Sequence, residues 1–344
     1  MGVAGQGTGL SKNAPGTRSL RSRFRELGGF SFIFVGRRPI GTLSKVTLET
    51  RSLHSRLKGV WGAYNSSLAT SITQRLPMWL PGLGFVRLLR ERRSLLYQLV
   101  RRDFEQRFVG SAAGWLWTVI QPAVLLFSWV FVFQYCMKVP PPPGAGGNYT
   151  LYLFCGYLPW LLFQDTVQRS TTVLTDRSSL ITKTVFPSEI LPVAILLSSF
   201  ISHAISMVLA VGAVFLFQHH FSVLILLLPF YTLMLGMFAL GVSWIASSLQ
   251  VYLRDTAQVT VVALTGWFWL TPIFIDETQF PEGARFLVHM NPLASVVKAY
   301  RLLMMDYKLP PADELATMCA ICVGTFFVGG FLFRHLKRGF ADVL

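Results

Sequence analysis

The sequence predicts an all-α membrane protein with six transmembrane helices, and three observations support this fold class. The chain has 344 residues, of which 52% are hydrophobic and 14% charged, and its mean hydropathy is +0.50. From about residue 110 onward, apolar runs recur near the ~20 residues that a bilayer core demands. Most of the excess positive charge lies ahead of these runs. A soluble domain of this length would be much less apolar.

The first 90 residues carry fourteen Lys and Arg against two acidic residues, and the whole chain has a net charge of +15. They are rich in Gly, Ser, Arg and Thr, so we expect a disordered basic extension over residues 1–90 and a transmembrane domain over residues 91–344. An organelle transit peptide and a start codon placed ahead of Met78 are open alternatives. Positive charge before a first span is typical of a cytoplasmic end, which argues against a nucleic-acid partner.

Residues 90–108, "RERRSLLYQLVRRDFEQRF", predict the first helix of the membrane domain. At helical spacing, five apolar side chains fall on one side and most charged ones on the other. The apolar five are Leu95, Leu96, Leu99, Val100 and Phe104. We therefore expect an N-terminal amphipathic interface helix that lies on the inner leaflet.

The apolar runs place six spans at about 112–137, 151–173, 191–217, 222–248, 257–275 and 313–333. An even number of spans leaves both termini on one side of the membrane. The arm before the first span and "FRHLKRGF" at 333–340 are both basic, which predicts that both termini are cytoplasmic.

Between the fifth and sixth spans, residues 275–311 are amphipathic rather than polar. The pattern predicts two short helices broken at Asn291-Pro292, because a residue before proline disfavours the helical conformation. We expect a re-entrant outer hairpin, which is tolerated at that depth only where protein or a water-filled cavity satisfies its backbone. Such a hairpin would cap a transport pathway.

Five segments, in this order, resemble the membrane-spanning permease subunit of type 2 ABC exporters for O-antigen, capsule and teichoic acid polysaccharides. The resemblance covers about residues 94–340. No single segment would establish it; the order and spacing of all five together do. The segments are "RRDFEQRFVGSAAGWLWTVIQP", "YLFCGYLPWLLFQDTV", "SSLITKTVFPSEILP", "VYLRDTAQV" and "TPIFIDETQFPEGARFLVHMNPL".

The resemblance implies a homodimer that docks on two copies of a separate ABC ATPase subunit. No Gly-x-x-x-x-Gly-Lys-Ser/Thr occurs in the chain, so ATP and Mg are expected on the partner ATPase and no cofactor on this chain. The implied ATPase-coupling residues are Ser179, Leu180, Ile181, Lys183, Phe186, Pro187, Glu189, Arg254 and Asp255. The implied interface-helix residues are Arg102, Asp103, Arg107 and Phe108.

The elbow between the second and third spans supports a coupling role from its own residues. A short helix that begins after Asp176 or Ser178 and stops at Phe186-Pro187 would transmit a rigid-body push to both spans. A plain polar hairpin is the alternative. It requires neither the helical stretch nor the two prolines, Pro187 and Pro192.

Aromatic residues in the spans suit a sugar cargo, because flat rings stack on sugar faces. Most of them are expected to form interfacial belts or to face lipid. The resemblance places a glycan pathway along Trp115, Trp117, Gln121, Trp267, Phe268 and Trp269, and an outer gate at Phe280, Pro281, Asn291 and Pro292. The implied substrate is a lipid-linked glycan that enters from the membrane lipid near the interface helix, in a multi-pass protein of the bacterial inner membrane.

Few charged or reactive groups lie inside the spans. Asp165 and Arg169 are four residues apart, which fits either an ion pair on one helix face or a polar lining of the inner vestibule. His203 is expected to be a hydrogen-bonded core residue. Cys319 and Cys322 have no second pair or nearby His, so packing is preferred to a metal or redox role.

Two other functions remain open at this point. An exporter of a drug or small lipid would have the same six-span plan. A membrane-embedded glycosyltransferase would need acidic or His residues gathered at one membrane face. Here Asp276, Glu277 and Glu282 are expected outside and the other acids are dispersed, so we expect a transport subunit with no catalytic or metal-binding residues.

Overall fold

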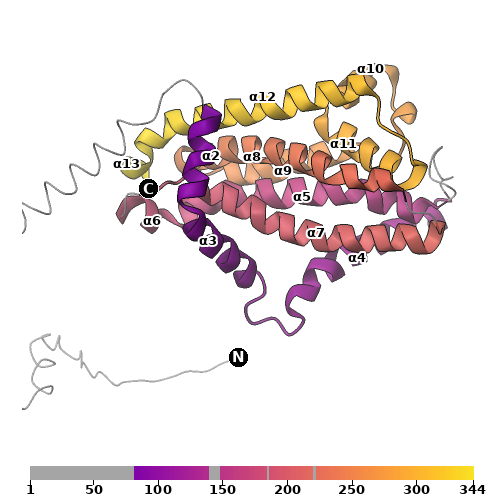
Figure 1. Cartoon of the computed structure of the whole chain (residues 1–344), viewed down its shortest axis with the longest axis horizontal. Coiled ribbons are helices and arrows are strands. Elements are labelled where there is room, and N and C mark those ends of the chain that lie inside the picture. Colours follow the sequence, from indigo (N-terminus) through magenta and orange to yellow (C-terminus); the bar gives the residue numbers. More distant parts are fainter. Residues whose placement is uncertain (1–80, 139–147, 184–185, 220–221) are drawn as a thin grey trace, which may run out of the picture. The chain divides into compact units, whose positions relative to one another are not determined.

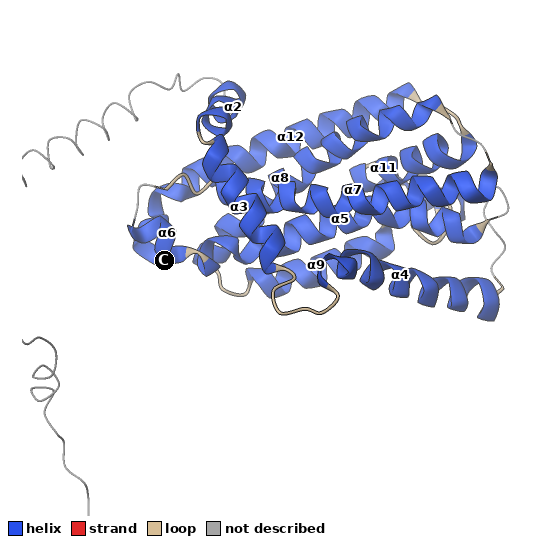
Figure 2. Cartoon of the chain, turned by 60° about the horizontal axis from the view of Figure 1, so that its bottom comes forward, coloured by secondary structure: helices blue, strands red, loops and turns tan. Residues whose placement is uncertain are grey.

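The computed structural model describes residues 81–138, 148–183, 186–219 and 222–344, which lie in one compact unit, Leu76–Leu344. Across these ranges the protein is helical and contains no strand (Figure 2). The basic extension expected over residues 1–90 lies outside the described residues as far as residue 80. Its last ten residues form most of a helix, α2 (Pro81–Glu91).

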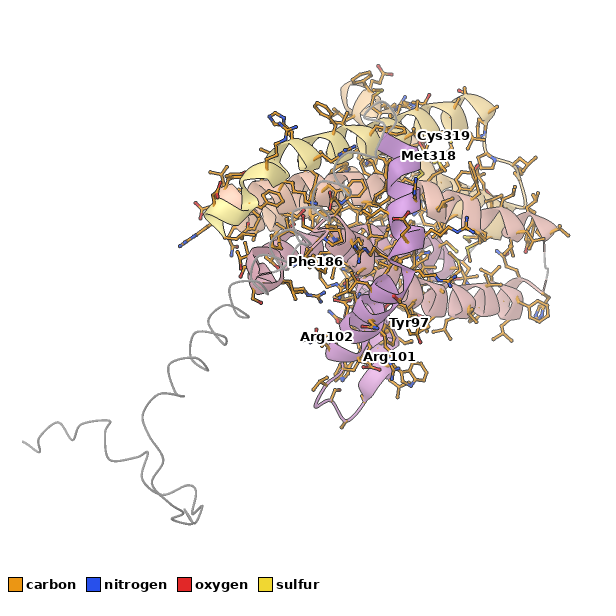
Figure 3. All side chains as sticks on the ribbon, turned by 60° about the vertical axis from the view of Figure 1, so that its left-hand side comes forward. Tyr97, Arg101, Arg102, Phe186, Met318 and Cys319 are labelled. Atoms are coloured by element: carbon orange, nitrogen blue, oxygen red, sulfur yellow. The ribbon has the colours of Figure 1, made fainter. Side chains whose placement is uncertain are left out.

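The expected amphipathic helix is α3 (Arg93–Gln106), which begins three residues later than expected and follows α2. Its apolar stripe packs on protein. Leu99 is buried, and Leu95, Leu96 and Val100 are partly buried in the same hydrophobic cluster. Tyr97, Arg101 and Arg102 lie on the exposed side of α3 (Figure 3).

Helices occupy all six positions where spans are expected. They are α4 (Trp117–Val130, extended by the turns Gly114–Leu116 and Phe131–Cys136), α5 (Tyr149–Asp176), α7 (Ile190–Gln218), α8 (Leu228–Tyr252, preceded by Val223–Leu227), α9 (Thr256–Leu270) and α12 (Ala312–Leu336). Four described stretches are long and apolar enough to cross a membrane: Gly114–Cys136, Ile190–Gln218, Val223–Tyr252 and Ala312–Gly339.

The two remaining helices differ from these four in different ways. The helix α5 is 28 residues long but carries Tyr, Trp, Gln and charged side chains, and most of it is buried between α7 and α8. By contrast, α9 is apolar but only 15 residues long, and nearly all of its side chains are exposed or half-buried. Figure 1 shows α5, α7, α8 and α12 running side by side.

Two glycines lie where α8 and α12 pack against each other. A Cβ atom on Gly329 would collide with the backbone of Gly241, and one on Gly241 would collide with the backbone at Thr325. The crossing therefore requires glycine at both positions, which lets the two backbones touch.

Short helices join the long ones at both ends. They are α6 (Ser178–Lys183), η5 (Glu277–Gln279), α10 (Glu282–His289), α11 (Pro292–Arg301), the π-turn η6 (Leu302–Asp306), η7 (Lys337–Gly339) and α13 (Phe340–Val343). The segment between α9 and α12 thus contains the two expected short helices, α10 and α11, with the break at Asn291-Pro292. Whereas α11 is buried against α5, α10 exposes Phe286 and Leu287.

Candidate functional site

The elbow between α5 and α7 contains the expected short helix, α6, which holds Ser179, Leu180 and Ile181 and ends at Lys183. Beyond residues 184–185, which lie outside the described ranges, Phe186 is half-buried in a hydrophobic cluster built from α3, α5, α7, α8 and α12. Pro187 accepts a hydrogen bond from the backbone N–H of Ile190 at 3.0 Å and so starts α7. At its N-terminal end, α6 follows α5 after Arg177.

Glu189, expected to contact the ATPase, has a partner within the chain. Its carboxylate accepts a hydrogen bond from Lys337 Nζ at 2.6 Å, at the end of α12. The indole N–H of Trp244 also donates to the Glu189 carbonyl at 3.4 Å. Glu189 thereby ties the elbow to α8 and α12.

Arg254 and Asp255 are exposed in the turn between α8 and α9, and a buried amide holds that turn in place. The side chain of Gln250 donates to the Arg254 carbonyl at 3.1 Å and accepts from the backbone N–H of Ala257 at 2.7 Å. Sequence reasoning did not single out Gln250, because a glutamine near a helix end carries no distinctive pattern.

Asp103 lies at the centre of a charge network that links α3 to α5. Its buried carboxylate lies 3.0 Å from Arg169 Nη1, 3.6 Å from Arg177 Nη2 and 3.8 Å from Arg107 Nε. Its neighbour Arg102 points to solvent. Of the expected interface-helix residues, Asp103 and Arg107 thus join α3 to α5, whereas Arg102 does not.

Asp165 forms the second half of this network. Its carboxylate accepts from Arg107 Nη2 at 3.0 Å and from Ser199 Oγ at 2.6 Å, and it lies 3.3 Å from Arg169 Nε. Arg107 also donates to Ser202 at 3.2 Å. The pair Asp165–Arg169 is therefore an ion pair along one helix, and its carboxylate also joins α3 and α7 through Arg107 and Ser199.

Three guanidinium groups and two carboxylates leave the network with one excess positive charge. Burial lowers the pKa of Arg107 and of Arg177, and the nearby carboxylates oppose that shift. An arginine in such a site stays protonated. The region between α3, α5 and α7 is therefore cationic.

A cavity of about 530 Å³ lies beside this network, between α3, α4, α5 and α7. One wall is polar and includes Arg107, Gln164, Asp165, Gln168, Ser199 and Ser202. The opposite wall is formed by Trp117, Gln121, Pro122 and Leu125 of α4 and by Phe108, which packs edge-on against Phe104. The cavity is amphipathic, with cationic and amide groups facing aromatic and aliphatic ones.

The residues expected along a glycan pathway fall into two sets. Trp115, Trp117 and Gln121 on α4 and Trp269 on α9 are exposed. Trp267 packs edge-on against Phe163 and Phe238, and Phe268 packs in an aromatic cluster with Trp129, Tyr157 and Trp160. The two sets meet at α9, where the ring of Trp269 lies edge-on against that of Phe268 with 5.6 Å between the ring centres.

Asn291 joins the end of α9 to the start of α11. Its amide oxygen accepts from the indole N–H of Trp267 at 3.0 Å and from the backbone N–H of Leu293 at 3.1 Å, and its amide nitrogen donates to Thr271 at 3.2 Å. It thus caps α11, which begins with buried Pro292. Of the other expected gate residues, Phe280 is half-buried and Pro281 exposed.

Arg301 is a buried cation that sequence reasoning missed. It donates to the carbonyls of Pro272 and Ile273 at 2.7 and 2.6 Å and to that of Tyr152 at 3.3 Å, and it lies 3.5 Å from the centre of the Tyr152 ring. Gly156 allows this approach, because a Cβ atom there would collide with the guanidinium. Arg301 therefore supplies hydrogen-bond donors to the carbonyl groups of the non-helical segment that follows α9.

Lys298 joins three separate segments at the same end of the protein. Its Nζ donates to Glu277 at 2.6 Å and to Glu314 at 2.7 Å, and these two carboxylates outweigh the effect of burial and raise its pKa. Asp276 accepts from Thr278 and caps η5. Within the described residues, no group of three or more His, Cys, Asp and Glu side chains is placed to hold a metal ion.

His203 is hydrogen-bonded in the core, as expected. Its Nε2 lies 3.1 Å from the Tyr300 hydroxyl, which lies 2.5 Å from Thr232 Oγ1. This chain of hydrogen bonds connects α7, α11 and α8. The cysteines of α12 are free thiols, with Cys322 buried and Cys319 half-buried.

Long apolar helices packed around the buried helix α5 indicate an integral membrane protein, and the matches to known proteins identify its class. Residues 94–305, well over half of the chain, match the family described as ABC-2 type transporter, so the chain belongs to that family of membrane transport subunits. It is 28% identical to the O-antigen export system permease protein RfbA of Myxococcus xanthus over 262 residues, which are 76% of this chain and 99% of that protein.

Two further relatives carry the same description. They are O-antigen export system permease proteins RfbA of Klebsiella pneumoniae, 26% and 27% identical over 252 and 256 residues. In both cases the match covers 73% of this chain and 95% of the relative. The chain is thus similar to these permeases over almost their whole length.

Proposed function

We propose that the chain is the membrane-spanning permease subunit of an ABC transporter that exports a lipid-linked polysaccharide of the O-antigen type across the bacterial inner membrane. The observation that carries this proposal is the match to O-antigen export permeases over 95–99% of their length. The helical membrane architecture and the family membership agree with it.

A separate ATPase supplies the energy in this proposal. The chain has no P-loop sequence, so ATP and Mg bind to the partner, and two ATPase copies serve a homodimer of this chain. The exposed turn at Arg254 and Asp255 and the helix α6 are the contacts on the cytoplasmic side. The packing of α6 against α5 and the ion pair between Glu189 and Lys337 support a rigid-body transmission of ATP-driven movement.

In the proposed topology all six long helices cross the bilayer and both termini are cytoplasmic. The polarity of α5 is compatible with a span, because a helix surrounded by other helices does not contact lipid. The helices α10 and α11 form the re-entrant outer hairpin. Asn291 and Arg301 support that position, because they form hydrogen bonds with backbone N–H and C=O groups outside the helices. Lipid chains could not form these hydrogen bonds.

The glycan passes, in this proposal, between the two protomers along the exposed sides of α4 and α9. Trp115, Trp117 and Trp269 present rings there that sugars can stack on. Trp267 and Phe268 support that surface from inside the protomer, where Trp267 also holds Asn291. Substitution of Trp267 should therefore impair assembly as well as passage.

Co-purification tests whether the chain is a transporter subunit. The full chain is solubilised gently from its own cells, and the proteins that accompany it are identified by mass spectrometry. A P-loop ATPase at equal stoichiometry is expected. Well-folded chain that carries no ATPase would overturn the proposal and favour an enzyme or a channel.

A further inference from the structure

The chain ends in a short helix that returns to the elbow between α5 and α7. After α12, the turn η7 redirects the chain, and α13 then packs against α6 and against α8. Figures 1 and 2 both show the C-terminus beside α6. Gly339 permits this turn, because a Cβ atom there would collide with the hydroxyl group of Tyr252. Tyr252 donates to the Leu336 carbonyl at 2.8 Å, which holds the end of α12 on α8.

Phe340 is the buried centre of this contact. Its side chain is 1% exposed, and its ring lies edge-on against that of Phe333 and tilted against that of Tyr252, with 5.5 and 6.1 Å between the ring centres. The hydrophobic cluster that contains Phe340 also takes in Ile181 of α6 and Leu344 at the C-terminus. Apolar packing therefore connects α6 with the ends of α8 and α12.

The same segment holds the other side of the elbow through charge. Lys337 Nζ donates to the carboxylate of Glu189, directly before α7, at 2.6 Å. Residues 337–344, which we call the C-terminal brace, thus contact the elbow at both of its ends. Phe340 lies at the end near α6, and Lys337 lies at the end near α7.

The helix α6 depends on support from other elements because it is short. It has six residues, and a helix of that length is not stable in water by itself. A break at Arg177, with φ −114° and ψ 29°, separates it from α5. Among the described elements, α6 packs mainly against α5, its neighbour in sequence, and against α13. The brace is therefore the main contact that α6 receives from a distant part of the chain.

We propose that the C-terminal brace fixes the position of α6, so that a push on α6 moves the long helices α5, α7, α8 and α12 together. Phe340 is the positioning residue, since it supports α6 from inside the protein. The proposal rests on the proposed function, in which α6 contacts the ATPase, and adds that the C-terminus of this chain controls that contact. Without the brace, a push would tilt α6 at the break and would not reach the long helices.

Hydrogen exchange of the purified full chain in detergent, read by mass spectrometry, tests the brace in the absence of the ATPase. Phe340→Ala should speed exchange in the peptide that covers residues 178–183 at least about tenfold, because it removes a buried ring from the cluster that holds Ile181. Exchange in the buried helix α11 should stay the same. Unchanged exchange in α6 would overturn the proposal, and so would faster exchange throughout the chain, which would indicate general unfolding.

Two further variants separate the brace from a general loss of packing. Phe340→Leu keeps a buried apolar side chain and should restore most of the protection of α6. Val343→Ala shortens an exposed side chain on the same helix and should leave exchange unchanged. An equal effect of Phe340→Ala and Val343→Ala would contradict the role of the buried ring.

Export and ATP hydrolysis test the coupling role in the complex of the chain with its ATPase. Phe340→Ala should lower surface polysaccharide about tenfold, while ATP hydrolysis by the purified complex stays within about twofold, because a loose α6 absorbs the push. Full export by a variant with a loose α6 would overturn the coupling role of the brace. A chain that exports no polysaccharide even without the substitution would contradict the proposed function instead.

Discussion

At the scale of single residues, Asp103 contacts more arginines than any other carboxylate in the part of the chain that the structure describes. One buried carboxylate faces three arginines: Arg107 directly after α3, Arg169 within α5 and Arg177 directly after α5. The loss of one partner from a buried charge cluster leaves the others uncompensated, which is far more damaging than the loss of a surface pair. The network should therefore hold α3 firmly in place.

Asp103→Asn should destabilise the protein by about 3–5 kcal/mol, the usual result when a buried ion pair loses one partner. Thermal unfolding of the purified protein in detergent, followed by tryptophan fluorescence, measures the change. Glu105→Gln is the control, because Glu105 pairs with Arg101 on the exposed side of the same helix at 2.7 Å. A surface pair is worth about 0–1 kcal/mol, so equal shifts in the two variants would contradict the role of Asp103.

Arg301 supports a second residue-scale prediction. Arg301→Met should leave the carbonyls of Pro272 and Ile273 buried without a donor, at a cost of about 1–3 kcal/mol for each carbonyl. The expected result is a clear loss of thermal stability and faster proteolysis in the segment after α9.

Arg285 offers a matched control for Arg301. It also donates to two carbonyls, those of Phe280 and Thr278, but it lies at the surface. Water can replace its hydrogen bonds, so Arg285→Met should be nearly neutral. If the two variants were equally stable, the non-helical backbone after α9 would not depend on Arg301.

At the scale of elements, the elbow between α5 and α7 is fastened to the end of α12. The contact between Glu189 and Lys337 joins residues 148 positions apart. A movement of the elbow must therefore break this ion pair or carry the end of α12 with it. This ion pair is the joint between the elbow and α12.

A charge exchange tests this joint. Glu189→Lys alone should reduce export, because it places two lysines together at the joint. The double variant Glu189→Lys with Lys337→Glu should restore most of the export, since it rebuilds the pair in reverse. Export is measured as polysaccharide at the cell surface. A double variant as inactive as the single one would show that Glu189 acts on another partner instead.

Most of the elements could be predicted from the sequence, because apolar runs and prolines are local signals. Helices occupy every expected span, and the break at Asn291-Pro292 lies where proline predicts it. The start of the first amphipathic helix was predicted less accurately, because the expected start at residue 90 falls inside α2. Charged residues continue from α2 into α3 with no proline or glycine between them. The apolar side of α3 was expected to face lipid, but it packs against α7. This contact depends on the tertiary position of α7, which the sequence pattern does not give.

The tertiary pairs could not be predicted in the same way. Asp165 and Arg169 are four residues apart, so their contact follows from helical spacing. Asp103 and Arg169 meet across 66 positions, and Arg301 meets Tyr152 across 149. Such contacts depend on how the helices pack, which periodicity does not specify. The two tryptophans of α9 likewise differ in exposure: Trp267 is half-buried against Phe163 and Phe238, whereas Trp269 is exposed. The sequence pattern does not distinguish them.

At the scale of the whole molecule, polar contacts concentrate at two levels of the helical unit. One level joins α3, α5 and α7 through Asp103 and Asp165, and the other joins α5, α9 and α11 through Asn291 and Arg301. Between these levels the protein presents the loosely packed helices α4 and α9. The two polar levels therefore join the long helices at two separate places, while most side chains of α4 and α9 remain exposed or half-buried.

The central claim is that the chain exports a polysaccharide, and surface display of that polysaccharide tests it most directly. The gene is deleted in its own organism, and surface and intracellular polysaccharide are quantified with and without the restored chain. The account predicts that deletion removes the polysaccharide from the surface while lipid-linked material accumulates inside, and that the restored chain reverses both changes. Unchanged surface polysaccharide in the deletion strain would contradict the claim.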